Sequence, residues 1–446
     1  MPEWRCAHYV RGLRRLSMRF LASSALVAAS VGFLLAACGD NSPAGNAEAY
    51  LKEPAPGAGP VVDAEVTSEA GAVDTAMDAA PDAEATDAGP PAVQLVGRFA
   101  DDPAGPIAAW PGTRIVARFA VPTGATATGN LSVKLREIEA SWMLDGAPSE
   151  WDVTVDGVLA PKQLVTTSNT TSDFTLATGL RAGIHEVELY KRSEAQNGAT
   201  QFLGFDLGGA TLLAPPARKT RRIEIVGDSA AAGFGILNDG GCPGAEWAAS
   251  YENFHLSFGA LAGESLDAEV MGTVYSGKGM AKDIYRPDTD TMPLLYPRSS
   301  PTDTAASWDF TRYVPDAMVV IIGGNDFAIG QGSDDPPATL AEFTTAYDGF
   351  VTSARAKNHA THVFMVVSPS VSDDTPPGHL TRTNIERGIA SVLARHAAAG
   401  DARLYALEPT SATPDLLTAC DGHGSPEWHR RLATEIAAAV RAKTGW

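Results

Sequence analysis

The chain has 446 residues, which is enough for two or three domains with ample core. Its formal net charge of −19 argues against a nucleic-acid partner, which would require a basic footprint. Eleven acidic residues and one lysine between Gly39 and Ala92 account for about half of that charge, so the remainder is only mildly acidic. An acidic substrate is therefore neither favoured nor excluded.

Residues 1–38 have the order of a secretory signal, in which basic residues precede an apolar run. The apolar run extends from Phe20 to Ala37, and Met18 offers an alternative start. It ends in Leu35-Ala36-Ala37-Cys38-Gly39, which resembles the lipobox of bacterial lipoproteins, where the cysteine is lipidated. We expect Cys38 to carry several acyl chains, which suffice for stable membrane anchoring. A plain cleaved signal and a membrane-spanning anchor are the alternatives.

This leader places the folded part outside the cytoplasm, lipid-anchored to a bacterial membrane at the outer membrane, the cell surface or in the periplasm. Residues 39–92 follow and consist mostly of Ala, Asp, Pro, Glu, Gly and Thr. Such a segment cannot bury enough apolar surface to offset its ordering entropy. We expect a disordered, self-repelling linker that acts as a spacer.

Residues 93–215 show short runs of alternating polar and apolar residues, separated by turn signals such as Val155-Asp156-Gly157. Short strands at roughly regular spacing favour an accessory β-sandwich or jelly roll. Trp110, Trp142 and Trp151 fit buried core positions better than a sugar-stacking platform.

Residues 216–446 alternate between strand and helix patterns. The predicted buried strands are Ile223–Val226, Ala268–Met271, Ala317–Ile322, Val363–Val367 and Leu404–Leu407. The predicted helices are Trp247–Ala262, Thr339–Ala356, Thr381–Ala399 and Pro426–Ala442. This order predicts a three-layer α/β/α domain with a five-stranded parallel sheet.

The chemically suited residues follow the predicted strand ends. Ser229 comes after the first strand, Gly277 after the second, Asn325 after the third, and His423 between the fifth strand and the last helix. The carboxyl ends of parallel strands share one edge of a sheet, so these residues can meet there. Acyl transfer needs a hydroxyl nucleophile, an imidazole base and oxyanion donors, and this set supplies all three.

These blocks resemble the SGNH (GDSL) hydrolase superfamily: Gly-Asp-Ser, a glycine block, Gly-x-Asn-Asp and a C-terminal Asp/His block. The chain is also similar to carbohydrate esterase family 2 over about residues 95–446. Segments that carry this similarity are 97–99, 110–113, 155–157, 183–185, 191–194, 222–224, 276–279, 308–310 and 420–423. The resemblance implies a jelly roll before a flavodoxin-like SGNH domain. It also implies an O-acetyl esterase for polysaccharides or oligosaccharides that needs no metal and no cofactor. We expect the protein to be a monomer.

Carried over by residue, the resemblance makes Ser229 the nucleophile, His423 the general base, and Ser229, Gly277 and Asn325 the oxyanion hole, with Gly279 a weaker substitute for Gly277. Asp421 is the candidate third member of a triad. It stands two residues before His423, whereas the superfamily aspartate stands three before, so a backbone carbonyl remains the alternative.

Three further groups of residues bear on the site: the cysteines, one histidine and three aromatic residues. Cys6 lies in the leader and Cys38 is the expected lipid site, which leaves Cys242 and Cys420 to form a disulfide in an oxidising compartment, or two free thiols otherwise. His429 fits a helix-surface histidine better than a metal ligand. Trp308, Tyr313 and Phe327 are candidates to stack a sugar ring, although core packing explains them equally well.

Two other function classes stay open at this stage. One is a GDSL lipase or phospholipase, against which the accessory module and the lack of an apolar lid weigh. The other is a non-catalytic glycan-binding surface lipoprotein, against which the joint presence of Ser229, Asn325 and His423 weighs. The acetylated glycan and its hydroxyl position are not determined by these residues.

Overall fold

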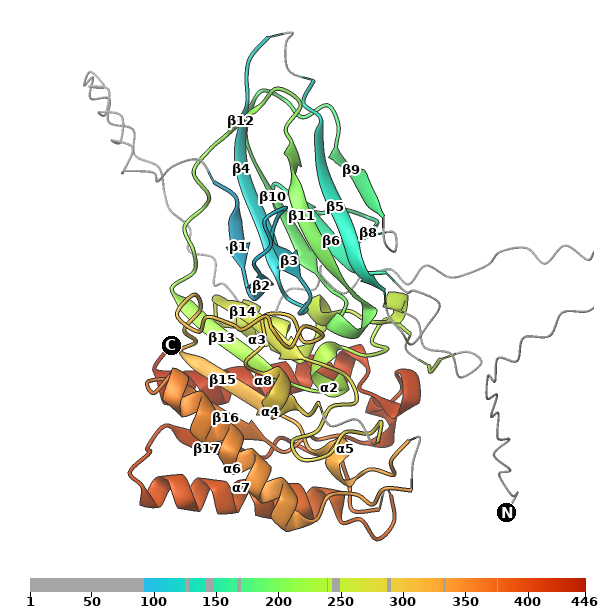
Figure 1. Cartoon of the computed structure of the whole chain (residues 1–446), viewed down its shortest axis with the longest axis vertical. Helices are drawn as coiled ribbons and strands as arrows, with labels where there is room; N and C mark the ends of the chain where they lie inside the picture. Colours follow the sequence, from blue (N-terminus) through green and yellow to red (C-terminus); the bar gives the residue numbers. More distant parts are fainter. Residues whose placement is uncertain are drawn as a thin grey trace, which may run out of the picture. The chain divides into compact units, whose positions relative to one another are not determined.

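The computed structural model describes residues 92–124, 128–140, 148–166, 170–238, 240–242, 249–286, 290–331, 334–374 and 376–446 (Figure 1). The expected signal, the lipidation site Cys38, the linker and Trp142 lie outside the described residues. Within the described part, no helix has both the length and the apolar character needed to cross a membrane.

The first part of the described chain is a sandwich of two antiparallel sheets. One sheet contains β1 (Gln94–Val96), β4 (Arg114–Val121), β10 (Gly183–Lys191), β6 (Glu150–Val155) and β7 (Val158–Leu159), with β12 (Thr211–Leu212) beside β4 and β8 (Leu164–Val165) beside β6. The other contains β2 (Phe99–Ala100), β3 (Ile107–Ala108), β11 (Gly198–Asp206), β5 (Leu131–Ala140) and β9 (Thr171–Ala177). The predicted β-sandwich is therefore confirmed.

Alternation along the strands explains the sandwich core. In β4, Ile115, Ala117 and Phe119 are buried and pack between the sheets, while their neighbours turn outward. Trp151 is fully buried in the same core, and its indole N–H reaches the Thr200 hydroxyl at 3.2 Å. Trp110 is also fully buried, but it packs in the cluster that contains Val226 and Met318 of the α/β part, so the prediction of a sandwich-core position is confirmed for Trp151 and not for Trp110.

The second part has a five-stranded parallel sheet in the order β14-β13-β15-β16-β17. These strands are β13 (Arg221–Gly227), β14 (Ala268–Val274), β15 (Ala317–Ile321), β16 (His362–Val366) and β17 (Leu404–Leu407). This is the flavodoxin-like strand order, with the first strand inside the sheet.

Helices cover both faces of this sheet (Figure 1). α3 (Phe258–Ser265) and α8 (Pro426–Thr444) pack on one face, where Ile223 and Ile225 point. α6 (Leu340–Lys357) and α7 (Thr381–Ala398) pack on the other, against Met318 and Val320. Three short helices lie in the loops: α2 (Ser229–Ala232), α4 (Met292–Leu295) and α5 (Gly324–Phe327).

The predicted strands and the last three predicted helices agree with the structure to within three residues at each end. The predicted helix Trp247–Ala262 was wrong in its first half. The chain there forms two 3-10 turns, Ala249–Tyr251 and Phe254–Leu256, before α3 begins. Asn253 separates them because its extended backbone and its side chain, which accepts from His255 N at 2.9 Å, start a new turn.

A buried ion pair joins the sandwich to β13 of the α/β part. The guanidinium of Arg98 lies 2.7 Å from the carboxylate of Glu224, and both side chains are almost completely buried. The backbone of the sandwich segment around Pro111 also lies close to that of β14. A Cβ on Gly272 of β14 would lie 2.8 Å from the Pro111 carbonyl. The sandwich therefore packs directly on β14, at the edge of the parallel sheet.

Candidate active site

Ser229 is presented by a sharp turn after β13. A Cβ on Gly227 would lie 2.6 Å from the Ile321 carbonyl, so only glycine fits between the strands there. Asp228 then caps α2, accepting from Ala230 N at 3.1 Å, and Ser229 is the first residue of that helix. The following alanines keep the space around the hydroxyl open.

His423 meets Ser229 although 194 positions separate them in sequence. Its Nε2 lies 2.7 Å from Ser229 Oγ, and its Nδ1 lies 2.8 Å from the Cys420 carbonyl oxygen. A carbonyl only accepts, so Nδ1 must carry the proton and Nε2 must accept from the serine hydroxyl. This is the tautomer that a general base needs.

Burial lowers the pKa of His423 from its usual 6.5, against the opposing effects of the Cys420 carbonyl and the Asp421 charge. The imidazole is therefore neutral and ready to accept a proton at pH 7. The Phe234 ring lies against the imidazole, with ring centroids 4.6 Å apart and planes inclined by 42°, and adds to this apolar setting.

The assignment of Asp421 as the triad acid was wrong in this structure. Nδ1 of His423 has its partner in the Cys420 carbonyl, and the Asp421 side chain is exposed at the rim of the site. The reason is local: Asp421 has a left-handed backbone, with φ of 54°, inside the 3-10 turn Cys420–Gly422. Ser229 and His423 thus form a dyad oriented by a backbone carbonyl, the alternative left open by the sequence.

Cys242 and Cys420 form a disulfide, as predicted, between the loop after Ser229 and the loop before His423. The same loops pack closely at Gly235, where a Cβ would lie 2.6 Å from the Cβ of Cys420. The bridge therefore fixes the residue whose carbonyl orients the imidazole.

Asn325 lies in the same cavity as Ser229, at the start of α5. Its amide nitrogen donates to the Lys278 carbonyl at 2.9 Å and to Asp228 Oδ2 at 3.2 Å. Donation to an oxyanion would replace the longer of these bonds. Burial, together with the charges of Asp326 and Glu194, raises the pKa of Asp228 to about 7.

Asp326 holds the glycine block in place. Its carboxylate accepts from the backbone amides of Met280 at 2.9 Å, Ala281 at 2.6 Å and Lys282 at 3.0 Å. Gly277 of the same block has φ of +81°, and Tyr275 N before it donates to the Gly227 carbonyl at 3.1 Å. The loop after β14 is thus tied to the turn that presents Ser229.

Gly279 is confined rather than exposed, because a Cβ there would lie 2.0 Å from the Lys282 carbonyl. Neither Gly277 nor Gly279 lines the cavity that holds Ser229 and His423. The oxyanion roles of Ser229, Gly277 and Asn325 stay predictions.

The cavity around the dyad has a volume of about 160 Å³. Ser368 and Ser370 also line it, and their hydroxyl oxygens lie 2.8 Å apart. The sequence analysis missed both, although they follow the carboxyl end of β16 and the strand-end rule would have found them.

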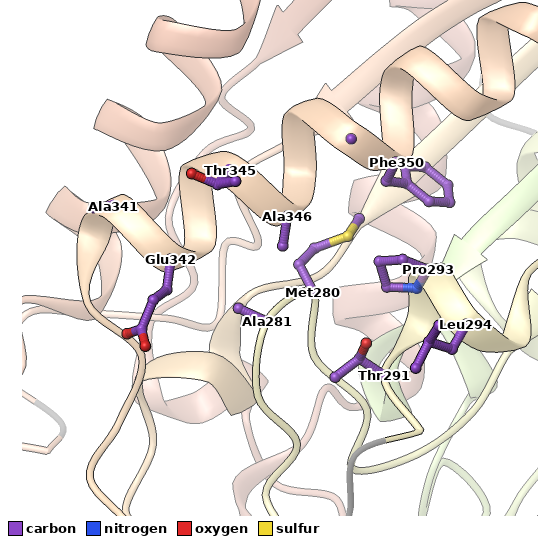
Figure 2. Close-up of a pocket in the computed structure, with 11 residues that line it drawn as sticks. Met280, Ala281, Thr291, Pro293, Leu294, Ala341, Glu342, Thr345, Ala346 and Phe350 are labelled. Carbon is purple, nitrogen blue, oxygen red and sulfur yellow. The ribbon is translucent and has the colours of Figure 1, made fainter.

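A larger hollow of about 650 Å³ lies elsewhere, between α6 and the segment around α4 (Figure 2). Glu342 is the acid that lines it, and its carboxylate is engaged in a capping box with Thr339. Its lining residues include the hydroxyls of Thr291 and Thr345 but no histidine, so no imidazole base stands beside them to activate a nucleophile.

The three aromatic residues proposed to stack a sugar are core residues, so that prediction was wrong. Tyr313 is 1% exposed and its hydroxyl donates to the carbonyls of Ile223 and Glu269, at the start of β13 and away from Ser229. Trp308 packs with Tyr313 and Met271, and Phe327 packs against Phe343 under α6. Burial of apolar area explains all three.

His429 is also buried rather than on the helix surface, which corrects the prediction. Its Nδ1 accepts from Phe258 N at 3.1 Å, and burial lowers its pKa to about 3. It therefore acts as a neutral link between α8 and α3. Within the described ranges, no group of three or more His, Cys, Asp and Glu side chains is arranged to hold a metal ion.

In the three-layer α/β/α domain, the Gly-Asp-Ser serine, the Gly-x-Asn-Asp asparagine and a C-terminal histidine meet at one edge of the sheet. This is the arrangement found in serine hydrolases of the SGNH type. Comparison of the chain with known proteins points to one family within this class. Residues 95–216 match the carbohydrate esterase 2 N-terminal domain. Residues 95–216 therefore carry the N-terminal domain of this family, and over 80% of its length the chain is similar to a family two carbohydrate esterase.

Two curated relatives are similar to this chain. The cellulase/esterase CelE of Acetivibrio thermocellus is 29% identical over 370 residues, covering 82% of this chain and 41% of the relative. An acetylxylan esterase/glucomannan deacetylase of Cellvibrio japonicus is 31% identical over 151 residues, covering 33% of this chain and 41% of the relative. The chain thus spans about two fifths of the length of these relatives.

A solved structure covers the described part more fully. A family two carbohydrate esterase from Clostridium thermocellum, in complex with cellohexaose, is 29% identical with a TM-score of 0.68. The match covers 80% of this chain and 100% of that one. It comprises both the sandwich and the parallel-sheet domain, which confirms the predicted fold class.

Proposed function

We propose that this chain is a serine esterase that removes O-acetyl groups from polysaccharide of the xylan or gluco/mannan type through an acetyl-enzyme. The observation that carries the proposal is the 2.7 Å contact between Ser229 Oγ and His423 Nε2, with Nδ1 held by a carbonyl. The names of the curated relatives, acetylxylan esterase/glucomannan deacetylase and cellulase/esterase, support a carbohydrate ester as substrate.

The reaction follows from the tautomer of His423. Nε2 takes the Ser229 hydroxyl proton as Oγ forms a bond to the acetyl carbonyl carbon, and the carbonyl oxygen becomes an oxyanion. The bond to the sugar oxygen then breaks, and that oxygen leaves with the proton from Nε2. Water repeats the sequence on the acetyl-enzyme and releases acetate and free Ser229.

Donors for the oxyanion are the amides of Ser229 and Gly277 and the side chain of Asn325. Each such donor is worth about 3 kcal/mol of transition-state stabilisation. Asn325 is the donor that lines the cavity together with the dyad.

The size of the cavity favours a short acyl group. About 160 Å³ must hold the reacting carbonyl and part of the alcohol, which leaves no channel for a long fatty chain. A lipase or phospholipase function is therefore disfavoured. A purely glycan-binding role gives no reason for a preset serine–histidine hydrogen bond.

The activity test compares esters that differ in the length of their acyl chain. We expect hydrolysis of p-nitrophenyl acetate and release of acetate from acetylated xylan or glucomannan, with rates that fall steeply from acetyl to octanoyl esters. Ser229→Ala should abolish turnover, while the control Ser411→Ala, in the loop after β17, should retain it. Equal rates on octanoyl and acetyl esters would contradict the acetyl preference.

We also propose that the enzyme works outside the cytoplasm, attached to a bacterial membrane through Cys38. The order of basic and apolar residues before Cys38 supports this location. Metabolic labelling with a palmitate analogue tests it. Label should be incorporated into the wild type and lost in Cys38→Ser, and equal labelling of the two would refute the anchor.

A further inference from the structure

The segment after β10 of the sandwich places a carboxylate beside the glycine block of the α/β domain. Glu194 has no exposed surface, and its carboxylate accepts from Ser276 N at 2.6 Å and from the Ser276 hydroxyl. Gln196 Nε2 donates to the same carboxylate at 2.6 Å. A sandwich residue therefore holds the residue directly before Gly277.

The turn that Glu194 holds determines where the Gly277 amide points. Lys278 N donates to the Tyr275 carbonyl at 3.4 Å, which closes a four-residue turn with Gly277 in its third position. The φ of +81° at Gly277 is that of a type II turn, and the Tyr285 ring would lie 2.8 Å from a Cβ there. Rotating the peptide between Ser276 and Gly277 would turn the Gly277 N–H to the opposite side.

This turn needs support from outside the sheet. It follows β14, the edge strand, so the parallel sheet flanks it on the β13 side alone. On that side, Tyr275 N bonds to Gly227, two residues before Ser229. On the other side, the Ser276 amide and hydroxyl are both bound by Glu194.

Glu194 is itself fixed at a second point. Its backbone N–H donates to Glu252 Oε1 at 2.5 Å, and Glu252 Oε2 accepts from Asn197 Nδ2 at 3.2 Å. Burial raises the pKa of both glutamates, and the charge of Glu194 raises that of Glu252 further. Glu252 thus ties the segment that carries Glu194 and Asn197 to the α/β part.

We propose that Glu194 is a positioning residue for the oxyanion hole. Through the hydrogen bonds of its carboxylate to Ser276, the accessory sandwich sets the direction in which the Gly277 amide points during the reaction. The proposal rests on the proposed esterase function, in which Gly277 supplies an oxyanion donor. It gives the sandwich a part in the chemistry besides any contact with substrate.

A purely structural role for Glu194 makes a different prediction, and the chain offers a matched control. Glu137 is another fully buried glutamate of the sandwich, with acceptor bonds from Ser149, Thr166 and Thr200. It lies within the sandwich on β5 and has no bond to the glycine block among these partners. Glu194→Ala and Glu137→Ala delete the same groups, but only the first releases Ser276.

The first readout is steady-state hydrolysis of p-nitrophenyl acetate by the full chain. We expect Glu194→Ala to lower kcat on the order of 10- to 100-fold, below the 10²–10³ for complete loss of an oxyanion donor, with KM changed less than about twofold. Glu137→Ala should keep kcat within about twofold. Glu194→Gln retains one acceptor oxygen and should recover most of the loss, and Ser276→Ala, which leaves Glu194 in place, should give a partial loss.

The second readout is hydrogen–deuterium exchange of the peptide that contains residues 275–278, which requires no activity. Glu194→Ala should speed its exchange while Glu137→Ala leaves it unchanged. Unchanged exchange in Glu194→Ala, an equal loss of kcat in both alanine variants, or a change in KM alone would overturn the proposal. If the wild type proves inactive on every ester, the proposed function fails, and the exchange result still decides whether Glu194 positions this turn.

Discussion

Replacement of Asp421 by asparagine separates a carbonyl-oriented dyad from a conventional triad. Asparagine removes the charge and tolerates the left-handed backbone of this position, with φ of 54°, so the fold is preserved. Because the Asp421 side chain is exposed, its field on His423 is screened, and exposed ion pairs contribute about 0.2–1 kcal/mol. We therefore expect kcat to fall by no more than about fivefold.

An aspartate that orients a triad histidine has a far larger effect, about 10⁴ in kcat. The two accounts thus differ by more than three orders of magnitude. The assay is hydrolysis of p-nitrophenyl acetate, which carries no sugar, so that any contact between Asp421 and a glycan does not enter the result. Ser229→Ala gives the background rate. A drop of Asp421→Asn to near that background would refute the carbonyl-oriented dyad.

Three further predictions concern the disulfide and the two histidines. Joint replacement of Cys242 and Cys420 by serine removes the bridge that fixes the position of the Cys420 carbonyl. The bridge closes a loop of 178 residues, and its loss of chain entropy in the unfolded state is worth up to about 5 kcal/mol. We expect a lower kcat and unfolding at lower urea concentration, and unchanged values of both would refute the role of the bridge. Because burial lowers the pKa of His423, kcat/KM should rise through a pKa below 6.5 and be constant by pH 7, whereas a midpoint above 6.5 in the pH–rate profile would contradict that environment. In the folded protein His429 has a pKa of about 3, so its contribution to stability is complete above pH 6.5 and falls as the pH drops toward 3. His429→Gln should reduce the loss of unfolding free energy between pH 6.5 and 5 by about 2 kcal/mol, as measured in urea titrations. Parallel losses in the wild type and the variant would contradict the burial of His429.

The sequence predicted well those features that depend on periodicity and order along the chain. Buried β-branched runs mark strands, and residues that follow parallel strands converge at one edge, which is why Ser229 and His423 could be paired before any coordinates. The disulfide followed from the compartment and from the two cysteines left over. Periodicity, the order of residues along the chain and the number of cysteines can all be read from the sequence, and the fold follows them.

Other features depend on three-dimensional detail that spacing does not encode. Tyr313 and Phe327 are aromatic residues near motif blocks, but which side of a loop enters the core is decided by packing. The single left-handed residue Asp421 turns a carboxylate outward and leaves a carbonyl in its place. His429 was predictable, since it shares a helical face with the buried Ala433 and Ala437.

The contact between Glu194 and Ser276 is another feature that could not be predicted from the sequence. The segment 191–194 was recognisable as part of the family pattern, yet its partner lies 82 positions further along the chain. Only the packing of the sandwich on β14 shows that a carboxylate of one domain supports a loop of the other.

The most direct test of the serine–histidine account is the mass of the enzyme during turnover. With p-nitrophenyl acetate and a rapid acid quench, the wild type should carry one acetyl group on the peptide that contains Ser229, and Ser229→Ala should carry none and show no turnover. An acetyl group on another residue, or full turnover by Ser229→Ala, would contradict the account.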